Sequence, residues 1–283
     1  MATRSHVYRN PGRDAGIGGH VDRNTQARKK SQMTTSLAFS GRGISLVAAD
    51  TRLSLSDPSF GVMHADGPDD FTLSVSSKNF VCVIPYRMRK IALANGAWFT
   101  TAGDFFSGKS ALSLLQTHGV IASEEVALIL SSKLDEILNI SRLLGFSDES
   151  SKETRVMAAL RQGVTWHCTL SNLKPVVNNG PFSFSINMPP SMDAAGQYLQ
   201  DQWKGGVENS LRTGDISVLI RATATLIHGA HLYAPCTSSR VQIGFTLEMG
   251  EGRARSAYLD GESGIIAAMS DDQIAHSLVD VVS

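Results

Sequence analysis

Hydrophobic and polar positions change their pattern abruptly after Met33. Residues 1–33 are polar and basic, and neither an alternation of two nor a helical spacing continues through them, so they cannot bury enough apolar surface to fold. Short apolar runs begin directly after this stretch. We therefore expect residues 1–33 to be a disordered leader, either a propeptide or a mis-assigned translation start, and residues 34–283 to form one folded domain.

Alternating positions and turn residues predict the strands of this domain. Thr35–Phe39 and Ile44–Ala49 are joined by Ser-Gly-Arg-Gly at residues 40–43, which is typical of a hairpin. Residues 55–79 are rich in Gly, Pro and Asp and predict a long loop or an irregular hairpin. Further strands are predicted at Phe80–Ile84, Ile91–Ala94, Trp98–Thr101, Val156–Leu160, Val164–Leu170, Phe182–Ile186, Val241–Leu247, Ala254–Leu259 and Ile265–Met269.

Apolar residues at helical spacing predict two pairs of helices and a terminal helix. The predicted helices are Ser107–Gln116, a segment with Ser123 as its N-cap and Gly145 as its stop, Ala195–Leu211, Thr213–His231 and a last helix that Ser270 opens. Helix pairs between sets of antiparallel strands predict an α+β fold. We expect a four-layer αββα sandwich, in which two antiparallel sheets lie between helical layers.

Composition and charge exclude several classes of function. The 283 residues are 42% hydrophobic and carry no net charge, so nothing predicts a general attraction to nucleic acid or to an anionic membrane. No apolar run reaches the roughly 18–20 residues that cross a bilayer. The three cysteines, Cys82, Cys168 and Cys236, form neither a disulfide framework nor a metal motif. We therefore expect a cytoplasmic protein that uses no metal and no cofactor.

Thr34 has a chemistry that depends on where the mature chain begins. A threonine hydroxyl is a poor nucleophile, but a free α-amine on the same residue, with a pKa of about 8, is a general base within reach of that oxygen. A nearby ammonium would lower the proton affinity of the hydroxyl, and a carboxylate would hold that ammonium. A backbone N–H at a tight turn would receive the developing oxyanion. Predicted strand ends offer these parts at Asp50, Lys90 and Gly103.

The same segments resemble a known family. Residues 34–39 (TTSLAF), 48–52 (AADTR), 90–91 (KI) and 102–104 (AGD) look like the proteasome β-type family of N-terminal nucleophile (Ntn) hydrolases, which includes the peptidase of the bacterial two-component ATP-dependent protease. The sixteen-residue step from Thr34 to Asp50 also matches. The resemblance is strongest over residues 34–110, and it implies the αββα fold of Ntn hydrolases.

The resemblance implies a role for each site residue. Thr34 would be the nucleophile, Asp50 would orient the catalytic lysine, and Gly103 would supply the oxyanion N–H. Lys90 is taken as that lysine. Arg89 would keep the usual spacing to the glycine, but arginine does not give up a proton at working pH.

Two motifs of the family are replaced in this chain. Its Gly-Ser-Gly turn before the third helix corresponds to residues 195–197, Ala-Gly-Gln, and its Asp-x-x-Ser-Gly segment to residues 235–239, Pro-Cys-Thr-Ser-Ser. Ser238, or its neighbour Ser239, would then serve in part as the serine that supports the terminal amine.

The resemblance implies a threonine endopeptidase in a self-compartmentalising assembly. Such an enzyme removes its own leader, forms a homo-oligomeric ring or double ring, and cleaves unfolded polypeptides that an ATPase or cap delivers. Two alternatives stay open: a non-catalytic structural subunit of such a ring, and an Ntn amidohydrolase that acts on a small amide. Thr34 would also become the first residue if translation began at Met33, since methionine is removed before a small residue.

Overall fold

The computed structural model describes most of the chain after Met33. The described residues are 34–51, 53–57, 61–65, 89–119, 121–143, 145–189, 192–234 and 237–281, with the backbone alone at 53–57 and 61–65. They all belong to one compact unit, residues 31–283. The predictions for the leader and for the strand Phe80–Ile84 lie outside the described residues.

The first sheet has six antiparallel strands in the order β10-β1-β2-β11-β12-β13. The predicted hairpin is confirmed, because its turn residues Arg42 and Gly43 both have positive φ angles, 47° and 75°, as a tight two-residue turn requires. The strand bounds are β1 (Ser36–Gly41), β2 (Ile44–Asp50), β10 (Phe182–Asn187), β11 (Arg240–Glu248), β12 (Ala254–Glu262) and β13 (Val279–Val281).

The second sheet has five antiparallel strands in the order β5-β6-β7-β8-β9. Its bounds are β5 (Ile91–Ala94), β6 (Ala97–Ala102), β7 (Arg155–Ala159), β8 (Val164–Thr169) and β9 (Asn172–Asn179). β9 was not predicted, because its sequence NLKPVVNN lies on the sheet edge and is mostly exposed. A separate hairpin of β3 (Leu53–Asp57) and β4 (Gly61–Ala65) occupies part of the predicted loop region.

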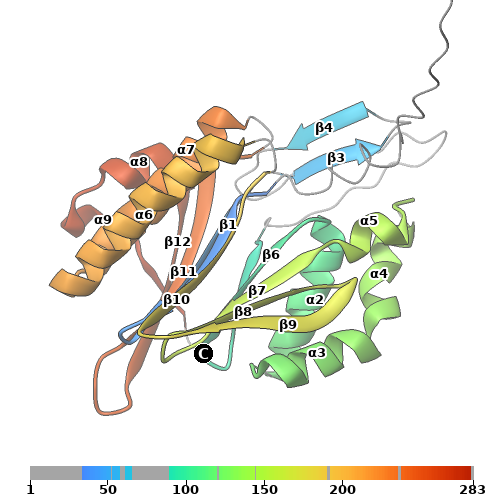
Figure 1. Cartoon of the computed structure of the whole chain (residues 1–283), viewed down its shortest axis with the longest axis horizontal. Helices are drawn as coiled ribbons and strands as arrows, with labels where there is room; N and C mark the ends of the chain where they lie inside the picture. Colours follow the sequence, from blue (N-terminus) through green and yellow to red (C-terminus); the bar gives the residue numbers. More distant parts are fainter. Residues whose placement is uncertain are drawn as a thin grey trace, which may run out of the picture. The chain divides into compact units, whose positions relative to one another are not determined.

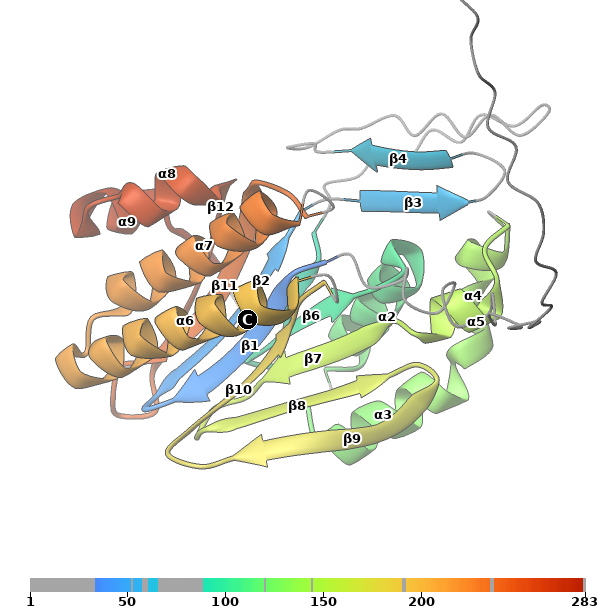
Figure 2. The same ribbon diagram turned by 45° about the horizontal axis from the view of Figure 1, so that its top comes forward.

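Helices form two groups, one for each sheet. Figure 1 shows α6 (Asp193–Thr213), α7 (Ile216–Tyr233), α8 (Ser263–Ala268) and α9 (Asp271–Ser277) on the outer face of the first sheet. The second group consists of α2 (Phe105–His118), α3 (Ser123–Ser132), α4 (Leu134–Leu143) and α5 (Asp148–Lys152). Figure 2 shows this group on the opposite side of the molecule, against the second sheet.

Three local predictions were wrong. The segment that begins at Ser123 is two helices, which meet at Lys133, and its N-cap is Ala122, whose side chain offers no oxygen. The predicted strand Ile265–Met269 is instead helix α8 and its C-cap. Ile266 is buried in the core on one side of α8, while Ile265 is 61% exposed. Only one side of this short apolar run is buried, which a helix with one apolar face allows.

Three separate apolar cores show the layer order. One core lies between α6–α9 and the first sheet and contains Phe39 and Trp203. Another lies between α2–α4 and the second sheet and contains Phe99. The third lies between the two sheets, where Ala38, Val47, Ile91, Trp98 and Met157 meet. The four-layer αββα sandwich predicted from the sequence is therefore confirmed.

Gly244 on β11 allows the two sheets to approach each other at Trp98. A Cβ atom at position 244 would lie 2.7 Å from Cη2 of the buried Trp98 and closer still to two other ring atoms. We expect Gly244→Ala to lower the free energy of unfolding by about 3 kcal/mol, because the large ring has no free space to move into. Chemical denaturation measures this loss.

Gly261→Ala is the matched control for this substitution. It also places a methyl group on a strand of the first sheet, but its nearest contact is the flexible tip of Ile266, at 3.3 Å. We expect a change below about 1 kcal/mol there. Equal denaturation midpoints for the two variants would contradict the close approach at Trp98.

Candidate functional site

Strand register brings the candidate residues to one end of both sheets. On the first sheet Ser36 pairs with Ala49, so Thr34 and Asp50 lie at the same end of the β1–β2 hairpin. On the second sheet Ile91 pairs with Thr100, so the residue before β5 and the residue after β6 also share an end. These residues are Lys90 and Gly103. A hydrogen bond between Lys90 and Thr34 joins the two ends.

Thr34 is buried and held from two directions. Its Oγ1 accepts a hydrogen bond of 3.2 Å from Lys90 Nζ. Its backbone carbonyl accepts one of 2.7 Å from Nδ2 of Asn187, the last residue of β10. The side chain and the main chain of Thr34 therefore each have a partner, and the hydroxyl is turned toward the lysine.

Asp50 ends β2 and is completely buried. Its Oδ2 accepts a hydrogen bond of 2.6 Å from the backbone N–H of Thr35. Its Oδ1 lies 3.5 Å from Lys90 Nζ and 3.4 Å from the backbone N of Ser238. A buried carboxylate needs such donors and a counter-charge to offset its lost hydration. The ion pair also fixes the direction of the lysine side chain.

Lys90, and not Arg89, is the basic side chain beside the threonine. Lys90 is 4% exposed and its Nζ reaches both Thr34 and Asp50. The Arg89 guanidinium lies instead over the Tyr258 ring, 5.0 Å from its centroid. Neighbouring residues in an extended chain point to opposite sides, so a shift of one position exchanges the two side chains.

Two other basic side chains, those of Lys109 and Arg155, are partly buried. Burial and, secondly, the charge of Arg89 lower the pKa of Lys109 on α2. Burial likewise lowers the pKa of Arg155, which pairs with Ala102 at the end of β6.

Gly103 occupies a position that only glycine tolerates. Its φ angle is +119°, and a Cβ atom there would lie 2.8 Å from the Thr154 Cα. The next residue, Asp104, caps helix α2 by accepting from the backbone N–H groups of Phe106 and Ser107. Gly103 thus links the end of β6 to the start of α2 at the same end of the sheet as Lys90.

Ser238 lies behind Asp50. Its Oγ accepts hydrogen bonds of 3.1 Å from Thr51 Oγ1 and 3.0 Å from the Arg240 N–H, and its own N–H reaches Asp50. The other segment compared with a family motif, residues 195–197, lies inside helix α6 and forms no turn before it. This agrees with the helix predicted over Ala195–Leu211.

Two buried amides at this site were missed in the sequence. Asn187 binds the Thr34 carbonyl, and Gln242 on β11 accepts from the Lys90 N–H at 2.9 Å. A signal existed for Asn187, because Phe-Ser-Phe-Ser-Ile-Asn on β10 alternates strictly and leaves a polar face that is buried. Gln242 stands in a buried apolar strand, and only the tertiary structure shows what it meets.

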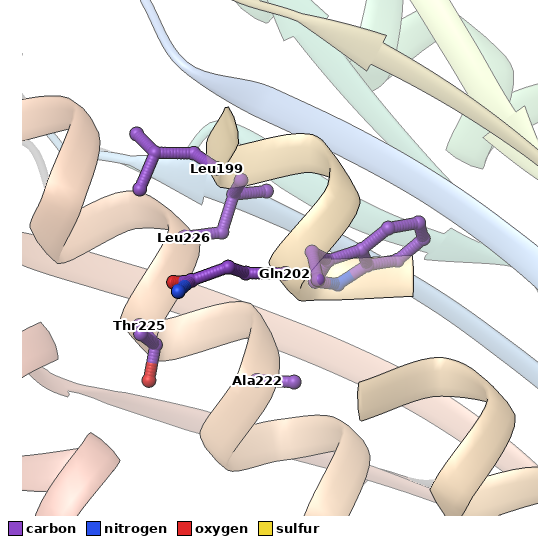
Figure 3. A pocket seen from close by; sticks show the side chains of 6 residues that line it. Leu199, Gln202, Ala222, Thr225 and Leu226 are labelled. Atoms are coloured by element: carbon purple, nitrogen blue, oxygen red, sulfur yellow. The ribbon is translucent and has the colours of Figure 1, made fainter. Parts of the chain in front are cut away.

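A pocket elsewhere on the molecule lacks the charged side chains found around Thr34. It measures about 350 Å³ and lies between α6 and α7, lined by Leu199, Gln202, Trp203, Ala222, Thr225 and Leu226 (Figure 3). These side chains include no titratable group. The chemistry-bearing residues gather instead at the sheet ends.

Two kinds of structural feature are relevant to the described part of the chain, metal-binding clusters and membrane-spanning helices. No group of three His, Cys, Asp or Glu side chains there is arranged to hold a metal ion. None of its helices is both long and apolar enough to span a bilayer. Burial raises the pKa of the Cys168 thiol to about 12, which disfavours the reactive thiolate form.

Comparisons with known proteins found similar solved structures at low identity but no match by sequence. No protein-family model matches the chain, and no curated protein matches its sequence. Among solved structures, Anbu (ancestral beta-subunit) from Yersinia bercovieri is similar with 12% identity and a TM-score of 0.42, over 75% of this chain and 80% of that one. A mutant of Anbu from Hyphomicrobium sp. strain MC1 has 10% identity and a TM-score of 0.46, over 86% and 95%.

These findings correct the family assignment made from the sequence. The segments within residues 34–110 resemble the proteasome β-type family, but the two solved structures named above are Anbu proteins, which are proteasome-like and form a distinct family. The assignment to the bacterial proteasome-like peptidases is therefore wrong. Short motifs of this kind can recur in more than one family, so they do not identify the family by themselves.

Proposed function

We propose that this chain, once Thr34 is its first residue, is an N-terminal threonine hydrolase that cleaves peptide bonds through an acyl-enzyme. One observation carries the proposal: Lys90 Nζ lies 3.2 Å from Thr34 Oγ1 and 3.5 Å from the buried Asp50 carboxylate. The ion pair with Asp50 stabilises Lys90, but a purely structural ion pair does not require a threonine hydroxyl beside it. The same arrangement is what an activated threonine needs.

The reaction begins with the Thr34 hydroxyl. The lysine ammonium lowers the proton affinity of Oγ1, and the α-amine of Thr34 takes the proton as Oγ1 attacks the peptide carbonyl. Asp50 keeps the ammonium charged and directed at the oxygen. In the uncut chain the Thr34 nitrogen is an amide with no basicity, so cleavage of the Met33–Thr34 bond creates the general base.

The second half of the reaction returns the enzyme. The tetrahedral oxyanion accepts a hydrogen bond from the Gly103 N–H, and the leaving amine takes the proton held by the α-amine. This gives an ester between Thr34 Oγ1 and the acyl half of the peptide. A water molecule, deprotonated by the same α-amine, then hydrolyses the ester and frees the carboxylic acid and the hydroxyl.

Covalent labelling of the mature chain tests this proposal. A cleavable fusion partner whose protease leaves Thr34 as the first residue supplies that chain without self-processing. A peptide epoxyketone reacts with both the hydroxyl and the amine of an N-terminal threonine, so we expect one adduct, located by mass spectrometry on the peptide that begins with Thr34. The chain that retains residues 1–33 should carry no adduct there.

The outcome also separates the alternatives. Absence of both labelling and peptide hydrolysis would favour a non-catalytic subunit. Hydrolysis of simple amides without peptide cleavage would favour a small-amide hydrolase. A ring, self-processing and a dependence on an ATPase or cap stay predictions that this experiment does not test.

A further inference from the structure

Gln242 reaches from the first sheet to the main chain of Lys90 on the second. It pairs with Ala49 on β2, which packs in the core between the sheets, so the Gln242 side chain points into the same space. The residue is 3% exposed. Its Oε1 accepts the 2.9 Å hydrogen bond from the Lys90 backbone N–H.

Asp260 determines which way the Gln242 amide faces. Gln242 Nε2 donates to Asp260 Oδ2 at 3.2 Å. Asp260 is held in turn by the Tyr258 hydroxyl at 2.7 Å and by Arg240 Nη2 at 3.0 Å. A reversed amide would place two donors face to face at Lys90 and two acceptors face to face at Asp260. The carboxylate therefore keeps the amide oxygen toward the lysine.

The rest of the Lys90 main chain is held as well. Its carbonyl accepts hydrogen bonds from Thr100 Oγ1 at 3.0 Å and from the Thr101 N–H at 3.3 Å. The segment of Ser238 that leads into β11 also donates its N–H to Asp50, the ion-pair partner of the lysine. Strand β11 and the residues just before it thus hold both the Lys90 backbone and the Asp50 carboxylate.

We propose that Gln242, oriented by Asp260, is a positioning residue that keeps Lys90 Nζ within reach of the Thr34 hydroxyl. The inference rests on the proposed function, in which that ammonium activates Thr34. A lysine side chain has four rotatable bonds, so the place of its amine depends on where its backbone is anchored. Misplacement of a catalytic group by about 1 Å can cost about a hundredfold in rate.

Gln242→Leu in the mature chain tests the inference, with Thr246→Val as its control. Leucine fills the space but accepts no hydrogen bond, so we expect kcat for a fluorogenic peptide to fall about 10- to 100-fold with KM almost unchanged. Thr246 lies on the same strand and face, where its Oγ1 accepts from Trp98 Nε1 at 3.1 Å. Thr246→Val removes this hydrogen bond and the one between Thr246 Oγ1 and Ser256 Oγ at 2.8 Å, so it should lower stability and leave kcat within about twofold.

Exchanging the amide and the carboxylate between positions 242 and 260 gives a second test. If Gln242 positions Lys90, the double exchange should restore the kcat that the single exchange lowers. Gln242→Glu still accepts from the Lys90 N–H but places a second carboxylate against Asp260, so it should lower kcat. Adding Asp260→Asn restores a donor opposite the new carboxylate. We expect this double variant to recover kcat to within about threefold of wild type.

The outcomes separate this inference from the proposed function. An active wild type with unchanged kcat in Gln242→Leu would overturn the inference and leave the proposed function standing. An inactive wild type would overturn the proposed function. The inference would then be tested by the Lys90 Nζ–Thr34 Oγ1 distance in a structure of the Gln242→Leu variant. A Lys90 Nζ–Thr34 Oγ1 distance still at 3.2 Å would overturn it, and a longer one would support it.

Discussion

Thr34→Val is expected to lower kcat/KM for peptide hydrolysis by at least about a thousandfold in the mature chain. Valine has the shape of threonine and leaves the fold unchanged, but it removes the only atom of that side chain that can attack a carbonyl. The fusion route to the mature N-terminus is essential here, because a loss of self-processing would otherwise hide the loss of catalysis. Initial rates with a fluorogenic peptide measure the effect.

Thr35→Val is a matched control one residue away. Thr35 is as deeply buried as Thr34, and its Oγ1 has no hydrogen-bond partner among the residues that the structure describes. Thr35 bonds to Asp50 through its own backbone N–H and carbonyl, and valine retains both groups. We expect kcat/KM within about threefold of wild type. Equal activity of the two variants would remove Thr34 from the mechanism.

Lys90→Met should lower both activity and stability, for different reasons. Loss of the ammonium removes the charge that activates the Thr34 hydroxyl, which we expect to cost about 10²- to 10³-fold in kcat. The same change leaves the Asp50 carboxylate buried without its counter-charge, which lowers the free energy of unfolding by about 3–5 kcal/mol. Peptide hydrolysis and chemical denaturation measure the two effects separately.

A second substitution separates these effects. Asp50→Asn in the Lys90→Met background removes the buried carboxylate charge, so stability should largely recover while activity stays lost. The amide oxygen can still accept from the Thr35 N–H. If Lys90→Met lost stability but kept its kcat, the lysine would be a structural ion-pair partner only.

Much of the fold could be predicted from local patterns. The β1–β2 and β5–β6 hairpins were expected because Arg42-Gly43 and Asn95-Gly96 suit turns with positive φ angles, which both adopt. Helix α9 was expected from Ser270, which forms a capping box with Gln273. These features depend on residues close in sequence, so the sequence was sufficient for them.

Predictions failed where a short segment depends on distant neighbours. The run Ile265–Met269 has the composition of a strand, yet it forms α8 because Ile266 packs under α7 and β12 in the core. β9 carries a weak pattern and forms because β8 offers it a partner. Sequence alternation also cannot choose between Arg89 and Lys90, since a shift of one residue reverses the face.

By itself the sequence determined the αββα architecture and named Thr34, Asp50, Lys90 and Gly103 as residues to consider together. The tertiary structure alone decided which atoms meet. Thr34 and Lys90 are 56 residues apart, Asn187 and Thr34 are 153 apart, and Gln242 and Lys90 are 152 apart. Strand register and the packing of one sheet on the other bring such pairs together. A local sequence pattern contains no information on which distant residues will be neighbours in space.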